Sequence, residues 1–449
     1  MSTSSSTTAS TAATASSVRS TLGQDVLARV EDTLAETDRL LAEVYPGDDG
    51  RRQPVHTVYV PADRFTPQLP QQWGQEALDT AAAHGGLAQL ASRTVAAESD
   101  SAPGLSSGAE YAAHLADLVE RKLTQEPIED LRLDFEDGYG RRSDAEENAH
   151  AAQAAREVAR ALKEGVAPPF IGIRFKCLEA DLRARGLRTL DVYLSTLVEA
   201  AGQLPDSTVI TLPKVTTVDQ VKAMNDVAAA LESGLGLAEG AIRYEVQVET
   251  PQLVVGADGT ADLARAIHAG QGRITSLHYG TYDYSASLGI AAAYQSMEHP
   301  AADYAKNVML TAVAMTGVHL SDGSTNILPV GSPDDVHAAW ALHARLVGRH
   351  LQRGIYQGWD LHPAQLPTRF LATFDFFSQS LDSTIDRLGR YVRAEASGVM
   401  DEPATAKALA RYVLRGTGCG AADPADVQAR TGVDVPTLQH LAATGLVPA

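Results

Sequence analysis

The stretch Tyr244-Glu245-Val246-Gln247-Val248-Glu249-Thr250-Pro251 alternates apolar and polar residues and then reaches a proline. Alternation with a period of two predicts a β-strand, and Pro251 ends it because proline has no N–H to donate. A later stretch, Leu277-His278-Tyr279-Gly280-Thr281-Tyr282-Asp283-Tyr284, is also a short run of β-type residues, and it ends in a turn at Gly280. Each predicted strand therefore delivers one carboxylate, Glu249 or Asp283, just beyond its C-terminal end.

Two carboxylates at the same end of neighbouring strands could hold one hard divalent cation. Magnesium suits this arrangement, because it prefers oxygen ligands and takes one or two carboxylates together with water and substrate. The alternative is that Glu249 and Asp283 are unrelated loop acids, and spacing alone does not separate the two interpretations.

Eight short runs of β-type residues follow one another along the chain, mostly with helical segments between them. Alternation of strand and helix eight times predicts an α/β protein of the (β/α)8 TIM-barrel type. A doubly wound open sheet is the alternative, but no glycine-rich phosphate-binding motif follows the first strand. The predicted strands are Val55–Val60, Leu131–Phe135, Phe170–Phe175, Thr208–Leu212, Arg243–Glu249, Ile274–Tyr279, Gly317–Ser321 and Tyr356–Leu361.

The regions around the predicted barrel have different patterns. Residues 1–22 are rich in Ser, Thr and Ala and lack the apolar core of a secretory signal, so we expect a disordered tail. Residues 23–50 have helical apolar spacing and predict an N-terminal helical arm laid against the main body. Residues 51–367 hold the barrel, and residues 368–449 predict a separate C-terminal helical domain.

Composition limits the classes of partner. The chain has 449 residues and a formal net charge of −19, which makes nucleic acid and anionic membrane poor candidate partners. No apolar run approaches the roughly 20 residues of a membrane-spanning helix. Cys177 and Cys419 are the only cysteines, and two distant thiols fit a reducing cytosol. We therefore expect a cytoplasmic protein that acts on a small molecule.

The C-terminal ends of the predicted strands are unusually polar, and chemistry in a TIM barrel gathers at these ends. A rim supplied with charge by most of its strands is hard to explain by packing. The residues concerned are Asp63, Arg64, Asp134, Glu136, Asp137, Arg174, Lys176, Lys214, Glu249, Asp283, Asp322, Asp360 and His362.

Several of these residues have a structural alternative. Asp134 could be paired with an inward arginine, and Arg174 could complete an internal ion pair. Lys214 is a common structural partner for such acids, so direct catalysis by it is the weaker interpretation. The sequence has no His-x-x-x-His helix, Cys/His cluster or Gly-x-Ser-x-Gly motif, which argues against a zinc site and a serine hydrolase.

These strand ends resemble the superfamily of citrate lyase β-subunits, malyl-CoA lyases, HpcH/HpaI 2-oxo-acid aldolases and malate synthases. Five segments resemble its "VPGNRP", "DLEDG", "VRVN", "LPK" and "IETP" motifs: Val58–Arg64, Leu133–Gly138, Ile173–Arg174, Leu212–Lys214 and Val248–Pro251. The resemblance departs from the pattern at Phe175-Lys176, where the family has asparagine.

Other segments are similar to the malate synthase branch. Gly280–Tyr284 resembles "GRWDYI", Gly317–Gly323 resembles "GAHAIGG", and Gly358–Pro363 resembles "GTWVAHP". Met400–Ala406 resembles "MEDAATA", in which the acid is the catalytic base; by this resemblance Asp401 or Glu402 is the candidate base. The alternative is that these acids cap the helix that follows.

The resemblance implies a magnesium-dependent barrel that makes or breaks a carbon–carbon bond, by aldol or Claisen chemistry, in a 2-oxo acid or 3-hydroxy acid. It implies Glu249 and Asp283 as Mg²⁺ ligands, with Mn²⁺ as the alternative ion. Arg174 would clamp the substrate carboxylate, because a guanidinium can form a bidentate pair.

Glu136 and Asp137 would orient metal-bound water or Arg174, and Gly280 would line the substrate site. We expect a small-molecule carboxylate substrate and a homo-oligomer, with neither nucleic acid nor membrane as partner; a coenzyme A thioester is left open as a co-substrate. Two other classes also stay open: a phosphoenolpyruvate mutase-type enzyme, and a catalytically silent barrel used for binding.

Overall fold

A computed structural model describes residues 21–48, 50–94, 107–394 and 402–448. The chain divides into two compact units, Met1–Pro46 and Gly47–Ala449. In the first unit, helix α1 spans Gln24–Val44 and buries none of its residues. The predicted arm of residues 23–50 therefore extends past the boundary between the units. Among the described helices, none is both long and apolar enough to cross a membrane.

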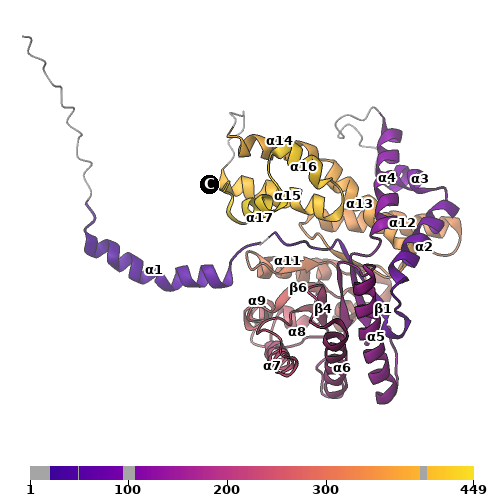
Figure 1. Cartoon of the computed structure of the whole chain (residues 1–449), viewed down its shortest axis with the longest axis horizontal. Helices are drawn as coiled ribbons and strands as arrows, with labels where there is room; N and C mark the ends of the chain where they lie inside the picture. The colour runs from indigo at the N-terminus through magenta and orange to yellow at the C-terminus, as the bar shows by residue number, and fades with distance from the viewer. Residues whose placement is uncertain (1–20, 49, 95–106, 395–401, 449) are drawn as a thin grey trace, which may run out of the picture. The chain divides into compact units, whose positions relative to one another are not determined.

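The second unit is built around eight parallel strands in the order β7-β6-β5-β4-β3-β2-β1-β8 (Figure 1). All eight predicted strands are present, and the predicted TIM barrel is confirmed as a nearly closed barrel surrounded by helices. The strands are β1 His56–Pro61, β2 Asp130–Asp134, β3 Phe170–Arg174, β4 Thr208–Leu212, β5 Tyr244–Val248, β6 Ile274–Tyr279, β7 His319–Ser321 and β8 Gly358–Asp360.

The barrel closes weakly between β7 and β8. These two strands have three residues each, and one isolated bridge joins Ser321 to Gln357. Two backbone hydrogen bonds support the closure: Asp322 N–H donates to Gln357 O at 2.8 Å, and Trp359 N–H donates to Gly323 O at 3.2 Å. By contrast, β2 and β3 pair along their whole length, from Asp130–Phe170 to Asp134–Arg174.

Helices follow the strands around the barrel, and local signals start and stop several of them. Ser143 and Glu146 form a capping box at the start of α5, which Gly165 ends in the left-handed conformation. The long connection after β1 contains α2 to α4. The helices are α2 Leu69–Ala83, α3 Leu87–Thr94, α4 Gly108–Gln125, α5 Asp144–Glu164, α6 Arg183–Ala201, α7 Val218–Leu235, α8 Pro251–Val254, α9 Asp262–Ala269, α10 Thr281–Ser287, α11 Pro300–Val313 and α12 Pro333–Gln352.

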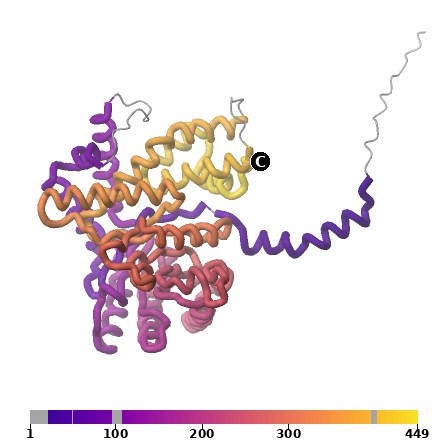
Figure 2. Tube along the Cα trace, turned by 180° about the vertical axis from the view of Figure 1, so that it is seen from behind, coloured from indigo at the N-terminus to yellow at the C-terminus, as the bar shows by residue number. Residues whose placement is uncertain are grey.

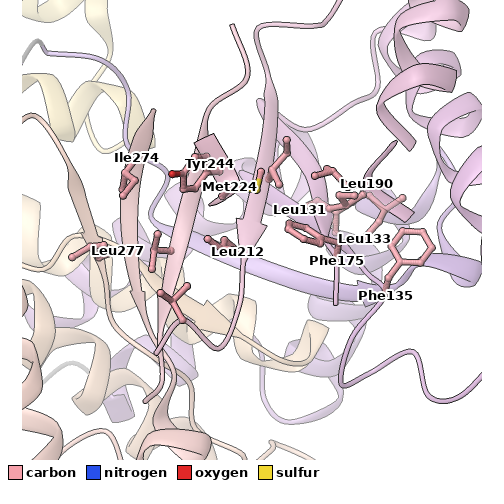
Figure 3. Close-up of a cluster of buried hydrophobic side chains, with 14 of the residues drawn as sticks. Leu131, Leu133, Phe135, Phe175, Leu190, Leu212, Met224, Tyr244, Ile274 and Leu277 are labelled. Carbon is pink, nitrogen blue, oxygen red and sulfur yellow. The ribbon is translucent and has the colours of Figure 1, made fainter. Parts of the chain in front are cut away.

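Alternate strand residues separate an apolar layer from a polar interior. Outward residues such as Leu131, Leu133 and Leu277 are fully buried in the layer between strands and helices (Figure 3). Inward residues are polar: Arg132 donates to Asp130 and, through Nη2, to Glu245 Oε2 at 2.7 Å. The period of two thus sends one set of side chains to the hydrophobic core and the other to the barrel axis.

Helix α13, Leu366–Ser378, packs on the barrel wall. Its Arg369 donates from Nη2 to Asp360 of β8 at 2.8 Å, and Arg369 Nη1 lies 2.8 Å from His350 Nε2 of α12. The expected domain boundary at residues 367/368 falls inside this helix. The later helices share one hydrophobic core with α2, α3, α4, α12 and α13, and they are α14 Leu381–Val392, α15 Pro403–Cys419, α16 Pro424–Thr431 and α17 Val435–Thr444.

Helices α15 and α17 contact the segment that leads into the N-terminal end of β1. Arg415 of α15 pairs with Asp48 at 3.0 Å, and Gln439 of α17 donates to Gly50 O at 3.4 Å. The tube view from behind shows the yellow C-terminal helices gathered beside this indigo segment (Figure 2). These helices therefore lie at the N-terminal ends of the strands, opposite the ends where TIM-barrel chemistry gathers.

Candidate functional site

Glu249 follows β5 and is nearly inaccessible, with 1% of its surface exposed. Its Oε1 accepts a hydrogen bond from the backbone N–H of Lys214 at 2.8 Å. Burial, followed by the nearby carboxylates of Glu136 and Asp283, raises the pKa of Glu249 to about 8, although Arg174 acts in the opposite direction. These effects disfavour the ionised form of Glu249 when no cation is present.

Asp283 comes from the neighbouring strand end. Gly280 follows β6 and donates its N–H to Val248 O at 3.0 Å, which places it beside Glu249. Asp283 lies in the first turn of α10 and is exposed. The two predicted ligands therefore occupy the same end of adjacent strands, and the charge of Asp283 contributes to the raised pKa of Glu249.

This pair fits the donor chemistry that magnesium requires. In the described part of the chain, no group of three or more His, Cys, Asp or Glu side chains is arranged to hold a metal ion. The protein itself would therefore supply two carboxylates, and water and substrate oxygens would complete the coordination. A cation here would also offset the repulsion that raises the pKa of Glu249.

Arg174 ends β3 and is held by Asp134, which ends β2. Both contacts of the fork, Nε to Oδ1 and Nη2 to Oδ2, measure 2.8 Å. The structural alternative for Asp134 is thus confirmed, and the bidentate face of Arg174 is directed at a protein carboxylate. The third nitrogen, Nη1, lies 3.2 Å from Glu136 Oε2 and 3.4 Å from Gln247 Oε1.

Asp134 also shapes the turn that carries Glu136 and Asp137. Its two carboxylate oxygens accept the backbone N–H groups of Glu136 at 3.0 Å and Gly138 at 2.9 Å. One short acid therefore fixes both the arginine and the following turn. The pKa of Asp134 is lowered: its burial alone would raise it, but Arg174 and these backbone donors outweigh that effect.

Lys214 contacts both Glu249 and the turn that carries Glu136 and Asp137. Its Nζ donates to Glu136 Oε1 at 2.8 Å and to Asp137 Oδ1 at 2.9 Å, while its own N–H binds Glu249. Its φ of +50° is unusual for a residue with a side chain. The prediction that Lys214 is a structural partner of the acids is confirmed, and Glu136 and Asp137 are brought to the site as expected.

Three further residues belong to the site and were not singled out from the sequence. Tyr59 and Trp359 bring their rings within 4.7 Å and 5.6 Å of the Arg174 guanidinium carbon. Gln247 Nε2 and Trp359 Nε1 are buried donors without a hydrogen-bond partner among the described residues. The signal that could have found them is the period of two, because all three occupy inward strand positions.

The structure does not bring Glu402, the one described C-terminal acid of the two candidates, to this site within one chain. Asp401 lies outside the described residues. Glu402 is the exposed N-cap residue of α15, and its side chain forms no capping hydrogen bond. Because α15 and α17 pack at the N-terminal ends of the strands, Glu402 lies toward the other end of the barrel from Glu249 and Asp283.

The fold and the strand-end carboxylates define a TIM barrel with its candidate site at the C-terminal rim. Within that class, the chain belongs to the family described as "domain of unknown function (DUF6986)", which matches residues 34–445. Over 112 residues it is 33% identical to an L-malyl-CoA/beta-methylmalyl-CoA lyase of Haloarcula marismortui. That match covers 25% of this chain and 29% of the relative, so it spans less than a third of the relative's length.

The solved structures to which the chain is similar include malate synthase, citrate lyase β-subunit and HpcH/HpaI aldolase family members. A Haloferax volcanii malate synthase in complex with magnesium and glyoxylate is 13% identical, with 88% of this chain and 98% of that chain covered and a TM-score of 0.47. A citrate lyase β-subunit from M. tuberculosis with oxaloacetate and magnesium is 16% identical, with 72% and 98% covered and a TM-score of 0.38.

Proposed function

We propose that this chain is a magnesium-dependent enzyme that forms or cleaves a carbon–carbon bond in a 2-oxo acid or 3-hydroxy acid. The observation that carries the proposal is the placement of buried Glu249 and exposed Asp283 at the same end of adjacent strands. The strand-end motifs and the partial likeness to a malyl-CoA lyase support the same class of reaction.

Glu249 and Asp283 would hold the cation, with Mn²⁺ as the alternative ion. When bound, magnesium supplies a Lewis acid that stabilises negative charge on a substrate carbonyl oxygen. Lys214 keeps Glu249 in place through its backbone N–H and holds Glu136 and Asp137 through its ammonium group. Glu136 and Asp137 are then positioned to orient water around the ion.

The substrate carboxylate would be held by donors around Arg174. Since Asp134 occupies the fork of Arg174, we propose that the unpartnered donors Gln247 Nε2 and Trp359 Nε1 bind the substrate carboxylate. Nη1 of Arg174, which now lies near Glu136 and Gln247, would turn to the substrate as a third donor. Tyr59 and Trp359 pack against the guanidinium and limit its movement. Gly280 serves the site by leaving room for Glu249.

Proton transfer needs a base near the substrate. Asp401 or Glu402 can take this role only if a neighbouring copy brings its α15 end to the C-terminal rim, because α15 packs at the opposite end of its own barrel. A homo-oligomer is therefore part of the proposal. A coenzyme A thioester is the proposed acyl partner in the Claisen variant of the reaction.

The experiment is a screen of acetyl-CoA and other acyl donors with glyoxylate and pyruvate, with and without magnesium. We expect magnesium-dependent turnover of one such pair in the natural chain and none in Glu249→Gln. Phosphate-dependent turnover of phosphoenolpyruvate would favour the mutase-type enzyme instead. A folded protein that binds a 2-oxo acid without turning over any pair would favour the silent barrel.

A further inference from the structure

The barrel has a cavity at the end opposite the candidate site. Its volume is about 330 Å³, and its wall includes the first residues of several strands: Phe170, Thr208, Thr275, His319 and Gln357 lie at or next to strand starts. The N-terminal ends of TIM-barrel strands usually serve stability. A space of this size at this end, lined in part by charged side chains, is not explained by packing.

Arginines from separate segments line the cavity. Arg51 and Arg52 come from the segment before β1, and Arg243 immediately precedes β5. Arg52 is already held by two carboxylates, because its Nη1 donates to Glu126 Oε2 at 3.1 Å and its Nη2 lies 3.1 Å from buried Glu129 Oε1. Arg243 is exposed and enters no ion pair within the residues that the structure describes.

The inner wall of the cavity is rich in acceptors. Asp130 and Glu245 share the single guanidinium of Arg132, which donates to both. His278 Nε2 lies 3.0 Å from Glu245 Oε2, and Ser276 is a further polar residue of the lining. All of these side chains are at least nine-tenths buried. A ligand that reaches the carboxylate oxygens of Asp130 and Glu245 would be stabilised by the hydrogen bonds that it donates to them.

A smaller cavity of about 120 Å³ adjoins the first and shares Arg51, Arg52 and His319 with it. Its other side is formed by α15, which contributes Arg411 and Arg415. Arg415 is held by Asp48 at 3.0 Å, and its guanidinium carbon lies 4.3 Å from the Tyr356 ring centroid. Positive side chains from the loop before β1 and from α15 therefore meet in one region.

We propose that the larger cavity binds a small ligand that carries an oxyanion at one end and hydroxyl groups at the other. The oxyanion, a phosphate or a carboxylate, lies against Arg51 and Arg243, because guanidinium forks match the geometry of both groups. The hydroxyl groups donate to Asp130 and Glu245. This site is separate from Glu249 and Asp283 and goes beyond the proposed function.

Binding to the full chain tests the proposal by calorimetry and thermal shift, without magnesium. Glycerol 3-phosphate and glycerate carry both features, with different oxyanions; inorganic phosphate carries only the anion and glycerol only the hydroxyls. We expect saturable millimolar-or-tighter binding of glycerol 3-phosphate or glycerate, weaker binding of phosphate and none of glycerol. Whichever of glycerol 3-phosphate and glycerate binds with higher affinity shows whether the oxyanion is a phosphate or a carboxylate.

Four variants localise the binding. Arg243→Gln should weaken the best probe on the order of tenfold, since one charge-assisted contact is lost, and Arg243→Lys should weaken it less. The control Arg156→Gln changes an exposed arginine on α5, far along the barrel wall, and should leave binding unchanged. Glu249→Gln should also bind normally.

Three results would overturn the proposal. The first is no saturable binding of glycerol 3-phosphate, glycerate or phosphate to the natural chain. The second is binding that survives Arg243→Gln unchanged, and the third is binding that disappears in Glu249→Gln, since either of these places the ligand elsewhere. None of these results depends on turnover, so a failure here is distinguishable from a failure of the proposed enzyme.

Discussion

Gly280 lies so close to Glu249 that a Cβ atom at position 280 would stand 2.5 Å from the Glu249 Cβ and 2.8 Å from its Oε2. The φ of Gly280 is −96°, so closeness rather than backbone conformation requires glycine here. We predict that Gly280→Ala displaces the Glu249 carboxylate and abolishes the rise in melting temperature that magnesium produces.

Gly234→Ala is the matched control for this substitution. Gly234 lies inside α7, and nothing stands within 4 Å of the position of its added Cβ. This variant should keep the magnesium response and gain about 0.5–1 kcal/mol of stability, because alanine favours a helix over glycine. A normal magnesium response in Gly280→Ala would show that Glu249 does not need the space.

Removing the charge of Glu249 should separate metal binding from folding. We predict that Glu249→Gln folds, loses most of its magnesium-induced thermal shift, and is at least as stable as the natural chain without magnesium. The reason is that Glu249 is buried beside Glu136 and Asp283, so its charge is unfavourable when no cation is present. Melting curves with magnesium and with a chelator provide the measurement, and an undiminished shift would remove Glu249 from the site.

Arg174→Lys tests the paired arginine. We predict that this variant loses most of its turnover and is destabilised by about 1–3 kcal/mol. A lysine keeps the charge, but its single nitrogen cannot replace the two hydrogen bonds that Arg174 donates to Asp134 and also reach the substrate. Turnover and urea unfolding should be measured together. Normal turnover combined with lower stability would assign Arg174 to structure alone.

The C-terminal acids can be tested by mixing variants. We predict that Asp401→Asn or Glu402→Gln lowers turnover sharply and leaves magnesium binding intact. If the base comes from a neighbouring copy, co-assembling that variant with inactive Glu249→Gln should restore part of the turnover, since mixed assemblies contain some complete sites. Normal turnover in both single variants, with about 1 kcal/mol of lost stability, would instead indicate a helix cap.

His350 should make folding sensitive to acid. Burial and then Arg369 lower the pKa of His350 to about 3, from an ordinary value of 6.5. Between these values the unfolded chain binds a proton that the folded chain does not, so stability falls as the pH drops. From about pH 7 to pH 5 this group costs about 2 kcal/mol.

His350→Gln, which cannot take up that proton, should therefore lose less stability over the same range, whatever its stability at neutral pH. The exposed His440→Gln should follow the natural chain. Urea unfolding at several pH values provides the measurement. Parallel pH profiles for the natural chain and His350→Gln would contradict the assignment.

The strands could be predicted because their patterns are local. Alternation within a run such as Tyr244–Val248 fixes both its extent and its inward face, and parallel pairing then brings Glu249 and Asp283 to one rim. The Asp134–Arg174 pair could be anticipated for the same reason. These features need no knowledge of contacts between distant segments.

Other features depend on contacts that the patterns do not encode. His350, Asp360 and Arg369 come from α12, β8 and α13, and their pairing follows from how those elements pack. The same holds for the side of the barrel that α15 covers: helical periodicity identifies the helix but not its docking place. The contacts of Arg174 Nη1 with Glu136 and Gln247 likewise depend on how separate strand ends are placed.

The short pairing between β7 and β8 has a consequence for motion. The free energy of local opening is lowest where few backbone hydrogen bonds must break. The barrel should therefore open transiently between β7 and β8 before it opens between β2 and β3. Trp359 lies in β8, with its ring 4.4 Å from that of Tyr59. Part of the aromatic packing around Arg174 therefore belongs to the strand at which the barrel should open most easily.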